Sequence, residues 1–231
     1  EQRRLCQLYL QIILYIVICI PSMIKLIIFD LGKVILDFSL SMIAEGLARR
    51  SNNYLYANPQ NIVDYMLGQG NYITVSYETG RIKSDDVYNY IKKTFSLDLT
   101  FHQFKQVWSD IFAENEGVAD LIDKLKKDFK LYLLSNTNEL HFEFIKQKFP
   151  VVHKFDTWIL SYEVGVMKPD PEIFRVALLK AGVGADEAIF IDDIRGHVLG
   201  AQGMGINAVE FKSVEQITSY IEEKVYEQSA K

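Results

Sequence analysis

Residues 24–34 read IKLIIFDLGKV, a short apolar run that ends in an aspartate and a glycine. The run is too short for a helix of its own and is rich in β-branched residues, which is typical of a strand buried on both faces of a parallel sheet. Asp30 follows the run directly, and Gly32 stands where the chain must turn. Open α/β sheets bind their ligands at the carboxyl ends of the strands. We therefore expect Asp30 to be the first residue of a functional site.

The remainder of the chain divides into two kinds of pattern. From Gly117 onward, strand-like runs at 130–134, 157–161, 188–191 and 206–210 alternate with amphipathic helical patterns. This alternation predicts an α/β fold with a doubly wound, Rossmann-like parallel sheet. Residues 39–115 instead indicate consecutive helices without a strand, with helix starts at Asn58-Pro59 and at the Thr100/Gln103 capping box. We expect a core of residues 23–38 and 116–231 that carries an inserted all-α domain at residues 39–115.

Charge and cysteine content exclude several classes of protein. The 231 residues carry a formal net charge of −5 at pH 7, and the short basic runs fall in helical patterns, so we expect no nucleic-acid partner. The two cysteines, Cys6 and Cys19, both lie in the first twenty residues. The rest of the chain therefore has neither a disulfide framework nor a thiolate metal site.

The first 22 residues differ in pattern from the rest of the chain. Arg3-Arg4 precede an apolar stretch at residues 8–20 that Pro21 closes, as in a signal or anchor segment. The stretch has no small-residue cleavage signature and is shorter than the roughly 20 residues of a spanning helix. Met23 stands directly before the first strand, where a start is expected. We interpret residues 1–22 as a non-native or upstream extension. We accordingly expect a cytoplasmic protein without a membrane partner. The alternative is a genuine anchor at residues 8–20.

Polar residues follow four of the predicted strands. They are Asp30, the segment Ser135–Asn138, Lys168 with its following proline, and the pair Asp192-Asp193. The carboxyl ends of parallel strands share one edge of the sheet, so these groups converge although they are far apart in the sequence. A carboxylate nucleophile, a hydroxyl, an ammonium group and paired carboxylates suit an anionic substrate. Aligned carboxylates repel one another unless a hard cation such as Mg²⁺ lies among their oxygens.

The order Asp-x-Gly-x-Val, Leu-Ser-Asn-Thr-Asn, Lys-Pro, Asp-Asp resembles the motifs of the haloacid dehalogenase-like hydrolases, over nearly all of the chain from Met23 onward. The helical insertion is similar to the helical cap of that superfamily. The segment LSNTNELH at 134–141 and Gly32 are further similar to its bacterial sugar-phosphate phosphatases, such as those acting on glucose 1-phosphate. The resemblance implies a Mg²⁺-dependent phosphoric monoester hydrolase for small phosphorylated metabolites, hexose 1-phosphates among them.

The resemblance also implies a role for each residue that meets the phosphoryl group. Asp30 would attack phosphorus and become an aspartyl-phosphate, which divides one hydrolysis into two easier steps. Ser135 and the amide of Asn136 would bind phosphoryl oxygens. Lys168 would neutralise Asp30 and the charge that gathers in the transition state.

The metal site that the resemblance implies is built from oxygen atoms at two strand ends. Mg²⁺ would bind Asp30, the main-chain carbonyl at Gly32 and Asp193. Asp192 would ligate the ion directly or through water. The sequence does not indicate an oligomeric state.

Gly32 departs from the family pattern, which usually has an aspartate at this position. That aspartate serves as acid for the leaving group and base for the attacking water, and such proton transfer contributes roughly 10²–10⁴-fold in rate. Lys33, His141 and His197 are candidates for a replacement, although a loop charge or a hydrogen-bonded surface imidazole is the simpler interpretation of each.

Two alternative functions stay open, the second of them because of Gly32. One is a 2-haloacid dehalogenase, which shares the nucleophilic aspartate but needs no metal, and against which the retained Asp192-Asp193 pair argues. The other is a catalytically weak binding or regulatory protein on a degenerate hydrolase fold.

Overall fold

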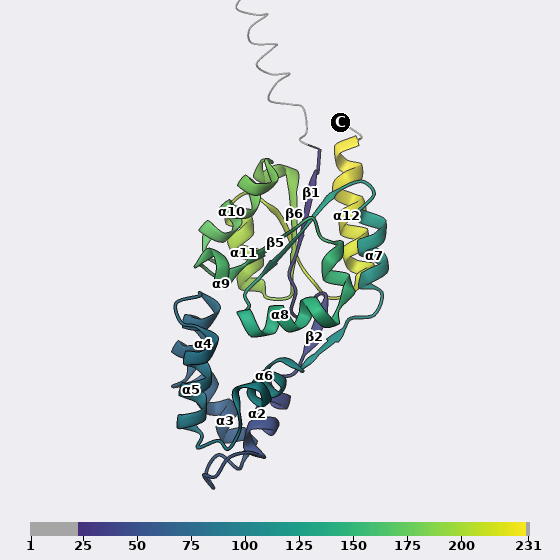
Figure 1. Cartoon of the computed structure of the whole chain (residues 1–231). Helices are drawn as coiled ribbons and strands as arrows, with labels where there is room; N and C mark the ends of the chain where they lie inside the picture. The colour runs from purple at the N-terminus through teal and green to yellow at the C-terminus, as the bar shows by residue number, and fades with distance from the viewer. Residues whose placement is uncertain (1–22, 230–231) are drawn as a thin grey trace, which may run out of the picture.

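The computed structural model describes residues 23–229 and has a five-stranded parallel sheet at its centre (Figure 1). The strands are β1 (Leu26–Phe29), β4 (Lys130–Ser135), β5 (Thr157–Leu160), β6 (Ala188–Asp192) and β7 (Asn207–Glu210). They are ordered β5-β4-β1-β6-β7, and every neighbouring pair is parallel. The predicted doubly wound sheet is therefore confirmed, and β1 is its middle strand.

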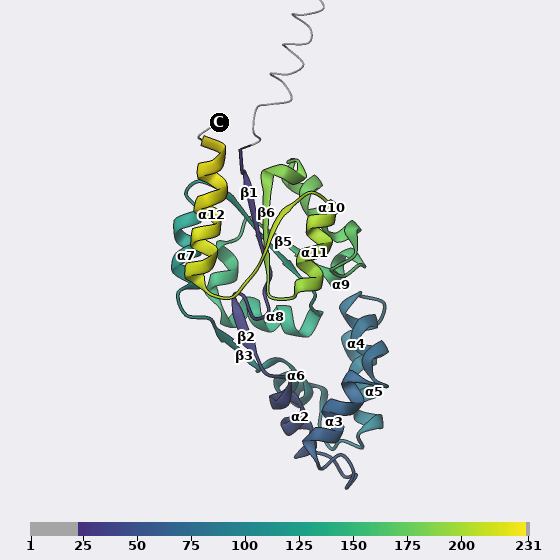
Figure 2. The ribbon, with the colours of Figure 1, turned by 180° about the vertical axis from the view of Figure 1, so that it is seen from behind.

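Helices cover both faces of this sheet. They are α7 (Val118–Leu125), α8 (Glu139–Lys148), α9 (Ser161–Val164), α10 (Pro171–Ala181), α11 (Arg195–Gly203) and α12 (Val214–Ser229), with short 3₁₀ turns η1 (Pro150–Lys154) and η2 (Ala185–Glu187). Successive side chains of a strand point to opposite faces. Ile27 and Phe29 pack in the apolar cluster with α7, α8 and α12, whereas Leu26 and Ile28 pack with α10 and α11. Figures 1 and 2 show these two sets of helices on opposite sides of the sheet.

A second group of helices lies between β1 and β4 in the chain. These helices are α2 (Leu40–Ala48), α3 (Pro59–Leu67), α4 (Asn71–Glu78), α5 (Ser84–Thr94) and α6 (Phe101–Ser109), and we call them the helical unit. They share an apolar cluster of their own. Asn58 caps α3 and the Thr100/Gln103 capping box begins α6, both as predicted.

One part of the helical prediction is wrong. The stretch 39–115 contains a strand, β3 (Phe112–Glu114), which pairs antiparallel with β2 (Leu36–Phe38). The two strands carry the chain out of the core and back. A strand of three residues is too short to show the alternation by which a strand is recognised in a sequence. It forms because it pairs with β2, some seventy residues away.

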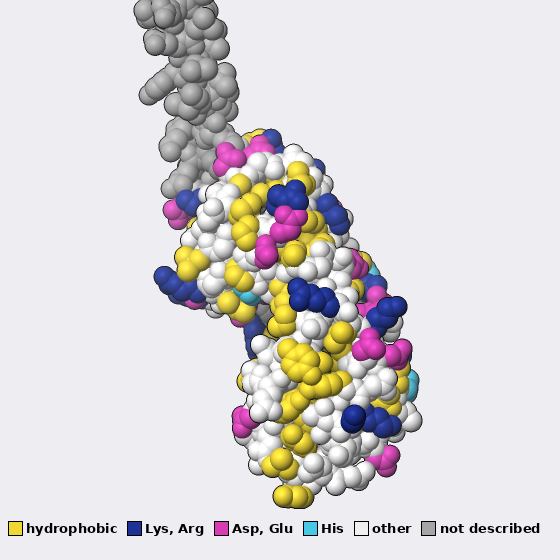
Figure 3. Space-filling model, turned by 90° about the vertical axis from the view of Figure 1, so that its left-hand side faces the viewer, with side chains coloured by type: hydrophobic (Ala, Val, Ile, Leu, Met, Phe, Trp, Pro, Cys, Tyr) yellow, Lys and Arg dark blue, Asp and Glu magenta, His cyan; other side chains and the backbone are white. Residues whose placement is uncertain are grey.

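The helical unit lies beyond the carboxyl ends of the strands and docks on α8 (Figure 1). The Leu140 N–H donates to Tyr77 Oη over 3.2 Å, and Ser109 Oγ donates to the Leu140 carbonyl over 3.2 Å. Gly80 packs so closely on Tyr162 that a Cβ atom on the glycine would come within 2.1 Å of the Tyr162 carbonyl oxygen. The molecule narrows between the helical unit and the core (Figure 3).

Two predictions remain untested by this fold. The interpretation of residues 1–22, including the apolar stretch at 8–20, lies outside the described residues. The boundaries of the core at 23–38 and 116–231 and of the helical domain at 39–115 stay a prediction. Between residues 23 and 229, no helix is both long enough and apolar enough to cross a bilayer.

Candidate active site

The middle three strands end in the residues that the sequence singled out. β4 ends at Ser135, β6 ends at Asp192, and Asp30 follows β1 between them. Lys168 arrives from the loop after α9, and its Nζ atom donates to Asp30 Oδ1 and to Asp192 Oδ2, each over 2.6 Å. The lysine side chain is 1% exposed, so this ammonium group is removed from bulk water. Residues 138 positions apart therefore meet, as the parallel-sheet prediction requires.

Asn136 fixes the position of Lys168. The Lys168 N–H donates to Asn136 Oδ1 over 2.8 Å, and Asn136 Nδ2 donates to the Lys168 carbonyl over 3.0 Å. The carbonyl of Leu134 accepts a third hydrogen bond from Lys168 Nζ at 3.0 Å. The Asn136 side chain thus positions the lysine, which leaves the Asn136 backbone amide as the group predicted to meet a substrate.

Ser135 has a buried hydroxyl group without a close hydrogen-bond partner among residues 23–229. The residue is 2% exposed, and within this part of the chain its Oγ makes only a long, 3.4 Å contact with the Asn136 carbonyl. A buried hydroxyl normally has a good hydrogen-bond partner. The Ser135 hydroxyl, at the carboxyl end of β4, is therefore suited to donate a hydrogen bond to an oxygen atom of a bound ligand.

Asp192 is held on three sides. Besides Lys168, it accepts from the Ile194 N–H at 2.8 Å through Oδ1, and His197 Nδ1 lies 3.0 Å from Oδ1 and 3.1 Å from Oδ2. Both carboxylate oxygens therefore already have partners. His197 was predicted only as an acid–base candidate, and the structure places it as a residue that orients Asp192.

The electrostatics differ among the three carboxylates. Burial raises the pKa of Asp30 to about 6 and the neighbouring Asp192 charge adds to the rise, while Lys168 opposes it. Burial acts in the same direction on Asp192, but the hydrogen bond from His197 and the charge of Lys168 hold the pKa of Asp192 below its usual value. Burial, followed by the Asp192 charge, raises the pKa of Asp193. The cluster is thus richer in negative charge than one lysine can balance.

This excess of carboxylates fits a hard cation. Asp30, Asp192 and Asp193 each offer an oxygen atom, and these atoms lie within 4.8 Å of one another. Carboxylate and carbonyl oxygens are the ligands that Mg²⁺ prefers. Since Asp192 is already engaged on both oxygens, Asp30 and Asp193 are the better direct ligands. Gly32 stands two residues after Asp30, where its carbonyl can complete the set.

The acid–base position holds no acid. A Cβ atom on Gly32 would come within 2.9 Å of Phe38 Cε1, so the phenyl ring occupies the space that a side chain would need. Lys33, the next residue, pairs with Asp37 and donates to the Phe38 carbonyl over 2.7 Å. Its ammonium group is therefore bound at the β2 turn.

His141 has partners on both ring nitrogens. Nε2 donates to the Trp108 carbonyl over 2.9 Å, and Asn138 Nδ2 donates to Nδ1 over 3.1 Å. Burial lowers the pKa of His141 to about 4, so the ring is neutral at physiological pH. The residue joins α8 to the helical unit and has no free proton to offer.

Sequence reasoning missed Ser161, which supports the loop after β4. Its hydroxyl accepts from the Thr137 N–H at 2.9 Å and donates to the Thr137 carbonyl at 3.0 Å, with the side chain fully buried. It is a polar residue at the end of β5. The same rule that selected Asp30 and Ser135, a polar residue directly after a buried strand, would have found it.

Comparison with known proteins agrees with this geometry. Residues 24–205 match the model of the haloacid dehalogenase-like hydrolases, and the chain belongs to this family. It is 30% identical over 178 residues to the D-ribitol-5-phosphate phosphatase of Bacteroides thetaiotaomicron, a match that covers 74% of this chain and 84% of that protein.

Solved structures give the same result. A HAD family enzyme from Bacteroides thetaiotaomicron superposes with a TM-score of 0.75 and 27% identity, over 86% of this chain and 98% of the other. That enzyme was also crystallised with magnesium and inorganic phosphate, and this complex superposes with a TM-score of 0.70 and 26% identity, over 83% of this chain and 96% of the other.

Proposed function

We propose that this hydrolase is a Mg²⁺-dependent phosphoric monoester hydrolase acting on small phosphorylated metabolites. The observation that carries the proposal is the buried Lys168 ammonium between Asp30 and Asp192, beside the third carboxylate of Asp193. A site with one nucleophilic carboxylate and surplus negative charge needs a cation to balance that charge. A divalent cation there would also bind an anionic phosphoryl group next to the nucleophile. The Bacteroides enzyme that binds magnesium and phosphate supports the same chemistry.

The covalent step follows from how Asp30 is held. Lys168 binds Oδ1, which leaves Oδ2 to attack phosphorus. The bond from Oδ2 to phosphorus forms while the ester bond to the leaving oxygen breaks, which gives an aspartyl-phosphate and an alkoxide that takes a proton from water to become the alcohol. Water then attacks the phosphorus atom, and Asp30 departs as a carboxylate with release of inorganic phosphate.

The groups around Asp30 bind the transferred phosphoryl group. Ser135 Oγ and the Asn136 N–H donate to its oxygens, and Lys168 offsets the charge that develops on them. Asp30, the Gly32 carbonyl and Asp193 are the proposed Mg²⁺ ligands, with Asp192 acting through water. When bound, the ion offsets negative charge on the phosphoryl oxygens and on the carboxylates.

Gly32 bears on the choice of substrate. With the Phe38 ring in place of an acid, departure of the leaving oxygen depends on its own basicity. An anomeric oxygen is less basic than a primary alkoxide, so we propose hexose 1-phosphates as better substrates than the matching 6-phosphates. The similar Bacteroides protein is named for D-ribitol 5-phosphate, which supports phosphorylated carbohydrates as the first compounds to screen.

The test is Mg²⁺-dependent release of p-nitrophenol from p-nitrophenyl phosphate by wild type, Asp30→Asn and the control Asp128→Asn. Asp128 is exposed and precedes β4, at the opposite end of that strand from Ser135, so its loss should leave turnover unchanged. We expect activity in wild type and control with Mg²⁺, and none in Asp30→Asn or in EDTA. Equal turnover by Asp30→Asn would overturn the proposal, and halide release from chloroacetate in EDTA would assign a dehalogenase instead.

A further inference from the structure

The Phe38 ring fills the place of an acid–base side chain two residues after Asp30. A Cβ atom on Gly32 would lie 2.9, 3.6 and 3.9 Å from three carbon atoms of this ring. The Lys33 ammonium group lies 4.9 Å from the centre of the ring, and the centre of the Phe112 ring lies 6.1 Å from it. Each such contact stabilises the position of an aromatic side chain by about 0.5–1.5 kcal/mol. The ring is therefore held in the site, and it neither gives nor takes a proton.

Three nitrogen-bearing side chains near the strand ends are committed to carboxylates. Lys33 pairs with Asp37, and His197 Nδ1 lies 3.0 Å from Asp192 Oδ1. Lys168 donates to Asp192 and to the nucleophilic carboxylate, each over 2.6 Å. A general base must lie within hydrogen-bond reach of the proton that it removes and must have a lone pair to receive it. These three groups hold carboxylates in place instead.

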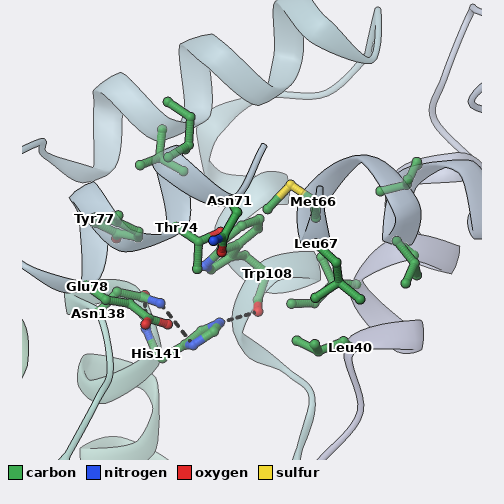
Figure 4. A pocket seen from close by; sticks show the side chains of 16 residues that line it. Leu40, Met66, Leu67, Asn71, Thr74, Tyr77, Glu78, Trp108, Asn138 and His141 are labelled. Atoms are coloured by element: carbon green, nitrogen blue, oxygen red, sulfur yellow. Dashed lines mark hydrogen bonds between the residues drawn. The ribbon is translucent and has the colours of Figure 1, made fainter. Parts of the chain in front are cut away.

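Two more titratable side chains lie where the helical unit meets α8 (Figure 4). Both ring nitrogens of His141 are hydrogen-bonded, one to the Trp108 carbonyl and one to the Asn138 side chain, and burial lowers the pKa of the ring to about 4. Glu78, at the end of α4, lines the same cavity as Asn138. Burial raises the pKa of Glu78 to about 7. Glu78 is therefore the group of the helical unit to test as a base.

Hydrolysis of a phosphate ester at Asp30 moves a proton in each of its two steps. The departing alkoxide gains a proton, and the water that attacks the aspartyl-phosphate loses one. Proton transfer by a positioned side chain contributes roughly 10²–10⁴-fold in rate. A carboxylate, whose conjugate acid has a pKa of about 4, both leaves and attacks as the anion. Exchange of a phosphoryl group between two carboxylates is therefore not slowed by the missing side chain at Gly32.

We infer that this protein has a second activity, the exchange of a phosphoryl group between small carboxylates, with acyl phosphates as donors. Asp30 Oδ2 forms a bond to the phosphorus atom of the acyl phosphate while the bond from phosphorus to the acyl oxygen breaks, which gives an aspartyl-phosphate and a free carboxylate. A second carboxylate then attacks the phosphorus atom and Asp30 departs as a carboxylate, which gives a new acyl phosphate. No proton is transferred in either step. The inference rests on the proposed aspartyl-phosphate and adds to it a class of donor and a class of acceptor.

Exchange should be faster than hydrolysis at this site. The donor and the aspartyl-phosphate are both acyl phosphates, so bonds of the same kind break and form. The second step is the reverse of the first, and in both of them Lys168, bound to Asp30 Oδ1, offsets the charge of the transition state. Water attack lacks a positioned base and loses roughly 10²–10⁴-fold in rate. We therefore expect exchange to be at least about tenfold faster than phosphate release at saturating carboxylate.

The test follows two products of one reaction. Full-length wild type with Mg²⁺ receives unlabelled acetyl phosphate and ¹⁴C-acetate, and label in acetyl phosphate and released inorganic phosphate are both measured above the rates without enzyme. We expect label to enter acetyl phosphate at least about tenfold faster than phosphate appears, and Asp30→Asn to lose both reactions. Phosphate release from acetyl phosphate without entry of label would overturn the inference.

Hydrolysis of p-nitrophenyl phosphate, measured beside the exchange, separates the inference from the proposed function. Wild type that hydrolyses p-nitrophenyl phosphate but incorporates no label into acetyl phosphate refutes the inference alone. Wild type that acts on neither compound refutes the proposed function as well.

Restoring an acid–base side chain gives the matched comparison. Gly32→Asp together with Phe38→Ala places a carboxyl group in the space of the ring, whereas Phe38→Ala alone only removes the ring. The ratio of exchange to hydrolysis should fall about tenfold or more in the double variant, because water attack regains a base, and should stay as in wild type in Phe38→Ala. An unchanged ratio in a folded double variant would contradict the inference. The wild-type exchange assay decides the question by itself if the double variant does not fold.

Two further variants test whether another residue supplies the base. Glu78→Gln and His197→Gln should each change exchange and hydrolysis by the same factor. A fall in hydrolysis of about 10²-fold or more with unchanged exchange, in either variant, would identify a base at that residue and overturn the inference.

Discussion

Replacing Lys168 with methionine should lower both stability and turnover, and Mg²⁺ should restore the stability but not the turnover. Among the described residues, the lysine ammonium is the one cation that bridges Asp30 and Asp192, and its side chain is 1% exposed. Removing one partner of a buried ion pair typically costs about 3–5 kcal/mol, because the remaining charges stay buried without compensation. For a protein of this size, 1 kcal/mol shifts Tm by about 2–4 °C. We therefore expect the Tm of Lys168→Met in EDTA to fall by roughly 6–20 °C.

Magnesium should restore much of this lost stability, because a divalent cation can balance the same carboxylates. Turnover should not recover, since the ammonium group also offsets charge in the transition state; we expect a loss of at least about 10²-fold in kcat. Thermal melts with EDTA and with Mg²⁺, beside Mg²⁺-dependent kinetics, measure both effects. Lys180→Met, an exposed lysine on α10, is the control. A collapsed Tm with unchanged kcat would make Lys168 purely structural, and an unchanged Tm in EDTA would refute the electrostatic reasoning.

Three further predictions concern the same site and its surroundings. Asp193→Ala should lose both turnover and Mg²⁺ binding, the latter measured by calorimetry. Ca²⁺ should inhibit the wild type, because its larger and more flexible coordination shell lets Asp30 bind the ion through both carboxylate oxygens. Full activity in chelator would contradict both expectations. Gly32→Asp should raise turnover of hexose 6-phosphates only when Phe38→Ala makes room for the side chain, since a Cβ atom at Gly32 lies 2.9 Å from the ring; a gain in the single variant would show that the ring moves freely. Burial lowers the pKa of His141 from 6.5 to about 4, so the stability that the neutral ring contributes is complete above pH 6.5 and is lost as the pH falls toward 4. Urea unfolding at pH 7.5 and 4.5 should show a loss of up to about 3 kcal/mol that His141→Gln lacks, and identical pH dependence in the two proteins would refute the assignment.

The sheet and the convergence of the site could be predicted because both depend on strong local patterns and one topological rule. The apolar run before Asp30 has the length and composition of a buried strand, and the other strands repeat that pattern at regular intervals. Parallel strands then bring Asp30, Asp192 and the loop carrying Lys168 to one edge without knowledge of any contact. Strand β3 was not predicted, because three residues are too few to show a strand pattern and the strand forms only by pairing with β2.

The finer features of the site depend on side-chain directions that a periodic pattern does not contain. The helical pattern shows which face of α4 or α6 is apolar, but not that the buried Trp108 N–H has no acceptor among the described residues. The Gly32 departure is visible in the sequence, whereas the Phe38 ring that fills its place depends on how β2 turns back on β1. The engagement of both Asp192 oxygens likewise needs the position of His197.

The most direct test of the central claim is to trap the phosphoryl group on Asp30. Full-length wild type and Asp30→Asn are mixed with a ³²P-labelled phosphomonoester and Mg²⁺, quenched in acid within one turnover, and analysed for label on the protein. We predict label on the wild type that hydroxylamine releases, as expected of an acyl phosphate, located in the peptide that contains Asp30 and absent from Asp30→Asn. Turnover of the substrate by Asp30→Asn at the wild-type rate, or label on any other residue, would contradict Asp30 as the nucleophile.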